Sequence, residues 1–172
     1  TCLKIVAKYF GKLILTQKLR NLSETTRAGS SLLGLSEASE KLGFRSLGVK
    51  ISLEKLEEAP LPCILHWDKK HYVVLYKITN SRLRIRNRSK AKNQVTYYIS
   101  DPAHGLLKYK KEDFLASWIG SNATATTEEG VALLLEPTPK FYNSKFDAKK
   151  KSLGFSFFFQ YLFRYQKFLT QL

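Results

Sequence analysis

Cysteine, methionine and acidic residues are scarce in this 172-residue chain. Its only cysteines are Cys2 and Cys63, which argues against a disulfide framework and indicates a reducing compartment. Methionine is absent, so we expect the chain to be part of a longer protein. Acidic residues number 14 against 29 basic ones, which gives a formal net charge of +15.

Several functional signatures are also missing. The N-terminus has no basic segment followed by an apolar run, so it does not read as a signal peptide. The three histidines and two cysteines show no zinc spacing, and the segment GKLILT does not fit the phosphate-binding loop pattern. We therefore expect neither a metal nor a cofactor in this part of the protein.

The positive charge is concentrated in two segments. Residues Arg82–Lys92 contain six basic side chains and no acid, and residues 145–172 contain six basic side chains and one acid, Asp147. The basic residues of a nucleic-acid-binding protein are typically spread over a whole face of the molecule, so we expect no nucleic-acid partner. Local contact with acidic lipid headgroups or an acidic partner fits this distribution better.

Hydrophobic periodicity predicts helices first and strands afterwards, which is an α+β arrangement. Helical spacing covers residues 2–10, 16–22, 30–43 and 110–120, with a short helical turn at 53–59. In the third helix we expect Ser30 or Ser31 to cap the N-terminus. The same helix should face inward with Leu32, Leu33, Leu35 and Ala38. Alternation and β-branched residues predict strands at 45–52, 60–67, 71–79, 95–100 and 130–137, with prolines marking an edge or the start of the second.

The C-terminal part has a different character. Residues 138–152 read as a linker, and residues 153–172 form a basic, aromatic, amphipathic pattern. The apolar run is too short to span a bilayer, which takes roughly 20 apolar residues. We expect this segment to be a helix lying in a membrane interface and leading toward a transmembrane domain; packing on the domain core is the alternative.

A His–Asp pair is predicted where two strands meet. If residues 71–79 and 95–100 form an antiparallel hairpin, then His71 at the start of the first lies beside Asp101 at the end of the second. A carboxylate bound to one ring nitrogen leaves the other free to serve a nucleophile. His66 precedes another strand, and His104 follows Asp101 too closely for a cross-strand contact. The plain alternative is a structural histidine beside an Asp-Pro turn.

Cys2 raises a separate question. It opens a predicted helix, where the backbone N–H groups favour a thiolate. Cys2 is therefore either a nucleophile or a small core residue.

Five stretches together resemble one known family. They are TCLKIVAKYFGK, GSSLLGLSEASEKLGF, LPCILHWDKKHYVVLYKI, YYISDPAHGLLKY and FLASWIG. In this order they resemble the N-terminal peptidase domain of bacteriocin-exporting ABC transporters, which is cysteine peptidase family thirty-nine. The resemblance covers residues 1–137. It implies a papain-like fold and cleavage of leader peptides after a Gly-Gly pair, coupled to export of the mature peptide.

The resemblance also assigns roles to residues and partners. It implies that His71 and Asp101 are catalytic, and that transmembrane and ATP-binding domains follow, ATP being bound only there. It further implies a homodimeric transporter, with this domain on the cytoplasmic face of the bacterial inner membrane. The family's nucleophilic Cys and oxyanion-hole Gln align before residue 1. Cys2 matches the family's second, non-catalytic cysteine, one helical turn farther along the same face.

Three functions stay open at this point. The first is a cysteine endopeptidase for double-glycine leaders, whose nucleophile we expect upstream of residue 1. The second is a degenerate domain that docks a peptide without cutting it. The third is a basic, membrane-anchored adaptor unrelated to proteolysis. Retention of both His71 and Asp101 favours the first.

Overall fold

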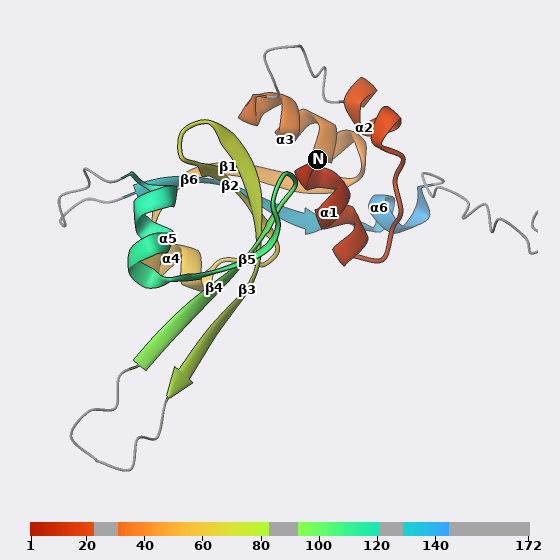
Figure 1. Ribbon diagram of the computed structural model, residues 1–172. Coiled ribbons are helices and arrows are strands. Elements are labelled where there is room, and N and C mark those ends of the chain that lie inside the picture. The colour runs from red at the N-terminus through yellow and green to blue at the C-terminus, as the bar shows by residue number, and fades with distance from the viewer. Residues whose placement is uncertain (23–30, 83–92, 121–128, 145–172) are drawn as a thin grey trace, which may run out of the picture.

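The computed structural model describes residues 1–22, 31–82, 93–120 and 129–144. In these ranges helices lead and antiparallel strands follow (Figure 1), so the predicted α+β class is confirmed. The elements are α1 (Cys2–Tyr9), α2 (Thr16–Leu22), α3 (Leu32–Lys41), β1 (Phe44–Ser52), α4 (Leu53–Glu58), β2 (Cys63–Trp67), β3 (His71–Arg82), β4 (Asn93–Asp101), β5 (Gly105–Lys110), α5 (Lys111–Trp118), β6 (Glu129–Pro137) and α6 (Pro139–Asn143).

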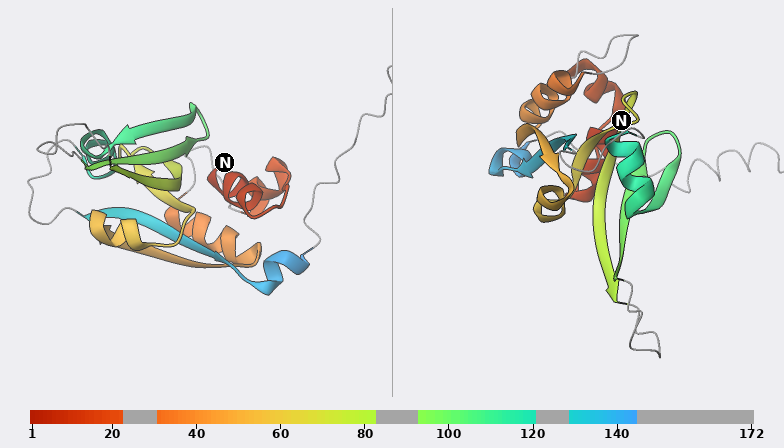
Figure 2. Two further views of the ribbon diagram at one scale, coloured as in Figure 1. Left: turned by 90° about the horizontal axis from the view of Figure 1, so that it is seen from below. Right: turned by 90° about the vertical axis from the view of Figure 1, so that its left-hand side faces the viewer.

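The described strands form one sheet in the order β1-β6-β2-β3-β4-β5, in which every neighbouring pair is antiparallel. Figure 2 shows the sheet strongly bent, so that β4 and β5 lie on one side of the molecule and β1 and β6 on the other. The β3–β4 hairpin projects beyond the remaining strands (Figure 1). The proline-flanked β2 lies between β6 and β3, so it is a central strand, and its prolines mark only its start.

The central strands are buried on both faces because successive side chains point to opposite sides of a sheet. In β2, Ile64 joins the core beneath α1 and α3. Its neighbours Cys63 and Leu65 join a second core beneath α4 and α5. Helix α1 therefore lies against the face of the sheet that Ile64 and Val74 share.

Most predicted elements are confirmed, with differences in detail. Ser31 caps α3, since its Oγ accepts from the Gly34 N–H at 3.0 Å. Leu33 was expected to face inward, which is wrong: it is 68% exposed, because α3 turns only Leu32, Leu35 and Ala38 toward the core. Strand β5 was not predicted.

The first part of the expected linker at 138–152 is a packed helix. Helix α6 lies within it, and Phe141 is fully buried against Phe44. Lys12 fastens the end of α6, since its Nζ donates to the carbonyl oxygen of Ser144 at 2.6 Å. The packed domain thus extends at least to residue 144. The predicted interfacial helix at 153–172 and the basic stretch after Arg82 lie outside the described residues. Among the residues that are described, no helix is long and apolar enough to cross a membrane.

We expect Gly43→Ala to destabilise the domain much more than Gly11→Ala. Both glycines have positive φ, +97° and +88°, which costs a non-glycine residue about 1–2 kcal/mol. A Cβ at Gly43 would also lie 2.5 Å from the backbone nitrogen of Phe141, whereas a Cβ at Gly11 meets nothing within 4 Å. Urea unfolding should show a loss of about 3 kcal/mol or more for Gly43→Ala and about 1 kcal/mol for Gly11→Ala. Equal losses would contradict the close packing of α6 on Gly43.

Candidate active site

The β3–β4 hairpin brings His71 and Asp101 together. The register pairs Val74 with Ser100, and one step further it places Asp101 opposite Val73, diagonal to His71 on the same face. Diagonal neighbours lie close enough for long side chains to meet. The His71 Nε2 and Asp101 Oδ2 atoms are 3.2 Å apart. The hairpin contact predicted from the sequence is thus present.

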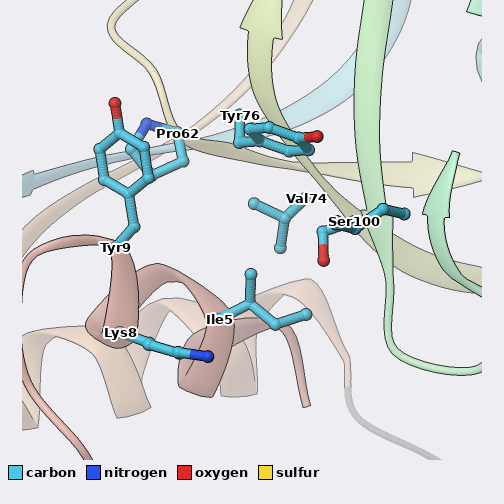
Figure 3. A pocket seen from close by; sticks show the side chains of 8 residues that line it. Ile5, Lys8, Tyr9, Pro62, Val74, Tyr76 and Ser100 are labelled. Carbon is cyan, nitrogen blue, oxygen red and sulfur yellow. The ribbon is translucent and has the colours of Figure 1, made fainter. Parts of the chain in front are cut away.

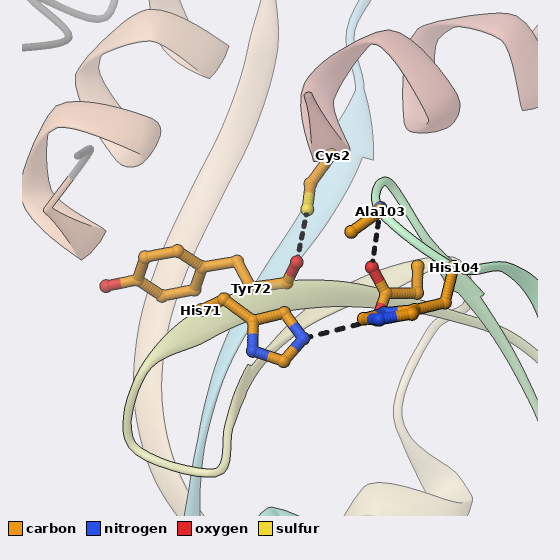
Figure 4. Close-up of polar contacts among 6 residues, drawn as sticks. Cys2, His71, Tyr72, Ala103 and His104 are labelled. Atoms are coloured by element: carbon orange, nitrogen blue, oxygen red, sulfur yellow. Dashed lines mark hydrogen bonds and ion pairs between the residues drawn. The ribbon is translucent and has the colours of Figure 1, made fainter.

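Asp101 is buried, with 4% of its surface exposed, and both of its carboxylate oxygens are bonded. Oδ1 accepts from the backbone N–H of Ala103 at 2.7 Å. Oδ2 faces His71 and also His104, whose Nδ1 lies 3.0 Å away. Figure 4 shows these groups converging where the strand ends. The contact of His104 with Asp101 was not predicted, because only partners on neighbouring strands were expected. The sequence feature that indicates it is the spacing of three residues across the Asp-Pro turn.

The surroundings of Asp101 keep it ionised. Burial alone would raise its pKa, but hydrogen bonds from the Ala103 N–H, from the two imidazoles and from the His104 backbone outweigh burial. Together they lower the pKa from 3.8 to about 2. At neutral pH the site therefore presents a carboxylate to His71.

This carboxylate should make stability depend on acidity. Because the folded pKa of about 2 lies below the unfolded value of 3.8, Asp101 stabilises the fold above about pH 4, and this contribution is lost as the pH falls through 2. The shift corresponds to about 2 kcal/mol. Urea unfolding between about pH 2 and pH 5 should show a steeper fall for the natural protein than for Asp101→Asn. Parallel curves would contradict the depressed pKa.

His71 is poised to use its second ring nitrogen. With Nε2–H donating to Asp101, the neutral ring carries its lone pair on Nδ1. Nδ1 has no hydrogen-bond partner among the described residues, and the side chain is 39% exposed. His66 instead stacks on Tyr72, with ring centroids 5.0 Å apart. His71 and His104 thus each face the Asp101 carboxylate with one ring nitrogen, but His104 is the more exposed of the two, at 70% against 39%.

Cys2 lies near this pair but its thiol is engaged. Its Sγ–H donates to the carbonyl oxygen of Tyr72 at 3.0 Å, as Figure 4 shows. The side chain is only 5% exposed. Burial raises the pKa of the Cys2 thiol to about 12, so at neutral pH the thiol stays protonated and is a poor nucleophile. Of the two interpretations left open for Cys2, the structure favours a small core residue.

An apolar groove lies between α1 and the strands (Figure 3). Helix α1 forms one wall with Ile5, Lys8 and Tyr9, and the strands form the other. The strand residues include Ser100, next to Asp101, and Leu106, which is 73% exposed. The remaining lining residues are Pro62, Val74 and Tyr76. A groove of this kind suits an extended or helical peptide with apolar side chains.

Several known proteins are similar to this chain in sequence. The model of the Peptidase C39 family matches residues 1–130. The colicin V secretion/processing ATP-binding protein CvaB of Escherichia coli is 29% identical over 134 residues, which are 73% of this chain and 17% of that protein. The lactococcin transport/processing ATP-binding protein LcnC-like of Lactococcus lactis is 32% identical over 146 residues, 83% of this chain and 18% of that protein. The chain thus spans less than a fifth of the curated relatives it matches.

Two solved structures are similar over most of the chain. One is a double glycine motif protease from an AMS/PCAT transporter in complex with the leader peptide. It superposes with a TM-score of 0.62 at 28% identity, covering 80% of this chain and 81% of that one. The other is the peptidase domain of Streptococcus ComA, a bi-functional ABC transporter involved in quorum sensing, with a TM-score of 0.59 at 28% identity, covering 80% and 89%. The papain-like fold expected from the sequence resemblance is therefore confirmed.

Proposed function

The chain belongs to the Peptidase C39 family, and from this premise we propose that it is the domain of a transporter that cleaves double-glycine leaders from exported peptides. The observation that carries the proposal is the His71 Nε2 to Asp101 Oδ2 contact of 3.2 Å beside an apolar groove. A related protease is known in complex with its leader peptide. His71 and Asp101 are the proposed catalytic residues of this chain.

The chemistry follows from the protonation states. Asp101 holds the Nε2–H of His71, so Nδ1 takes the proton of a cysteine thiol and gives a thiolate–imidazolium pair. The thiolate attacks the carbonyl carbon of the second glycine, and the C–N bond breaks as the His71 imidazolium donates its proton to the leaving amine. Water then attacks the thioester, again with His71 as base, and releases the leader.

We propose that the thiol comes from a residue preceding Thr1 in the full-length protein. The buried, hydrogen-bonded Cys2 does not suit the role. The motif resemblance aligns the family's nucleophile four residues before Cys2, one helical turn away on the face that Cys2 shares. The backbone N–H groups at the start of α1 favour a thiolate at that place.

The groove beside α1 is the proposed docking site for the leader. Its lining is mostly apolar, and its lining residue Ser100 directly precedes Asp101 in the sequence. Apolar leader side chains would supply binding energy in the groove. The two glycines have no side chains, so they would fit a narrow cleft beside the nucleophile.

We expect Leu106→Glu to weaken leader binding without unfolding the domain. Leu106 is 73% exposed and lines the groove, so a carboxylate there leaves the core intact but lies against apolar leader residues. The KM for a leader peptide should rise about tenfold with kcat nearly unchanged, the effect of roughly 1.4 kcal/mol of lost binding.

Leu47→Glu is the matched control for this experiment. Leu47 is 59% exposed on β1, at the opposite edge of the sheet. Its substitution should leave KM unchanged. Equal KM values for both variants would contradict the placement of the leader in this groove.

The wider setting is also a proposal. The relatives are secretion/processing ATP-binding proteins. We propose that transmembrane and ATP-binding domains follow this one in a homodimeric transporter, with the peptidase on the cytoplasmic face of the membrane. Residues 153–172 are the proposed interfacial helix, because their sequence is basic, aromatic and amphipathic.

Mass spectrometry can test the function. The full-length protein is incubated with a peptide that carries an apolar amphipathic leader ending in Gly-Gly. Cleavage after the second glycine supports the proposal. Binding of the peptide without cleavage would identify a docking module instead, and a peptide that neither binds nor is cut would reject both.

A further inference from the structure

Two imidazoles share one oxygen of Asp101. His71 Nε2 lies 3.2 Å from Oδ2, and His104 Nδ1 lies 3.0 Å from the same atom. The two rings come from different places: His71 begins β3, and His104 lies in the turn between β4 and β5. Figure 4 shows the rings of His71 and His104 facing one another, with Ala103 above His104.

The shared oxygen determines which ring nitrogens carry protons. An ionised carboxylate only accepts, so both His71 Nε2 and His104 Nδ1 must donate. A carboxylate oxygen has two lone pairs and can accept both bonds. With the Ala103 N–H on Oδ1 at 2.7 Å, the carboxylate accepts three hydrogen bonds, two of them at Oδ2.

His104 is the replaceable part of this arrangement. Its side chain is 70% exposed, so it contributes little to the core. Asp101, by contrast, is 4% exposed and has few water molecules to replace a missing donor. Loss of the His104 donor would leave Oδ2 with His71 alone and would let the carboxylate rotate about its Cβ–Cγ bond, away from the orientation that serves His71.

We propose that His104 is a positioning residue that holds Asp101 in the orientation required by His71. It acts through Asp101 and touches neither the thiol nor the substrate. The proposal rests on the proposed peptidase function for its kinetic consequence, whereas its structural part concerns only the three described side chains.

The kinetic test uses the full-length protein with His104→Ala and His104→Asn. The Asn side-chain N–H₂ can occupy the place of Nδ1–H and keep the donor. We expect kcat for leader cleavage to fall about tenfold in His104→Ala and to stay within about threefold of the natural value in His104→Asn, with KM unchanged in both. The melting temperature should be nearly the same for all three proteins. A folding defect would instead lower the melting temperature of both variants.

A second readout does not need the thiol. Nitrogen NMR of the 172-residue chain reports the tautomer of the neutral His71 ring. We expect the Nε2–H form in the natural chain and in His104→Asn, and a mixture of tautomers in His104→Ala. An unchanged tautomer together with unchanged kcat in His104→Ala would overturn the proposal, as would a failure of Asn to restore either readout.

The two readouts separate this proposal from the peptidase function. If the natural full-length protein cleaves no leader but the tautomer of His71 still depends on a donor at residue 104, then the peptidase function fails and the positioning role stands. If the natural protein cleaves and neither His104 variant differs from it, the peptidase function stands and the positioning role fails.

Discussion

Replacement of His71 by alanine is expected to lower leader cleavage by at least about 10³-fold. Without the imidazole, no group among the described residues takes the thiol proton or returns a proton to the leaving amine. The loss should appear in kcat, because the apolar groove proposed to bind the leader is untouched. Single-turnover cleavage by the full-length protein, followed by mass spectrometry, measures it.

Cys2→Ala is the control for this prediction. Its thiol donates to the Tyr72 carbonyl oxygen, and burial raises its pKa to about 12, so its removal should change kcat no more than a few-fold. If Cys2→Ala instead abolished cleavage and His71→Ala did not, Cys2 would be the nucleophile and the proposed use of His71 would be wrong.

Asp101→Asn should reduce kcat by about 10²- to 10⁴-fold. The amide can present its N–H₂ group to His71 and so favour the tautomer that accepts at Nε2. In that tautomer Nδ1 carries a hydrogen and cannot take the proton of the thiol. The amide also lacks the charge that stabilises the imidazolium. The KM for the leader peptide should be unchanged. Steady-state kinetics that determine kcat and KM separately for both proteins check this.

Asp68→Asn provides a matched control. Asp68 lies in the turn between β2 and β3, three residues before His71, and its φ is +49°. Asn tolerates this left-handed conformation as well as Asp does, so the substitution removes a charge near the site without straining the turn. It should leave kcat within about twofold. Similar losses in both variants would show that the general charge near His71, and not the Asp101 contact, matters.

The helices and strands were largely predictable because they depend on local patterns. Helix α2 begins and ends at the predicted residues, and the alternation in β1 and the β-branched run in β3 define strands directly. The errors have physical causes. Strand β5 begins with the exposed Gly105 and Leu106, so its alternation covers only residues 107–110. Leu33 was misplaced because Leu32, Leu35 and Ala38 share one side of the helix at intervals of three residues, and Leu33 does not lie on that side.

The site was partly predictable for the same reason. Strand polarity alone brought the start of β3 beside the end of β4, and so predicted the contact of His71 with Asp101. The His104 contact depends on the course of the turn after Asp101, where Gly105 has a φ of +87°. The burial of Cys2 and the position of the apolar groove depend on how α1 packs across the sheet.

The sequence by itself therefore determined the α+β class, the order of elements, the family resemblance and the His71–Asp101 pair. Each of these depends on local sequence patterns or on the direction of neighbouring strands. Only the tertiary structure decided that Asp101 serves two histidines, that the Cys2 thiol is buried against Tyr72, and that an apolar groove forms between α1 and the strands. These features arise where segments distant in sequence pack together. Hydrogen-bond sharing and burial are properties of that packing, and no local pattern of residues encodes them.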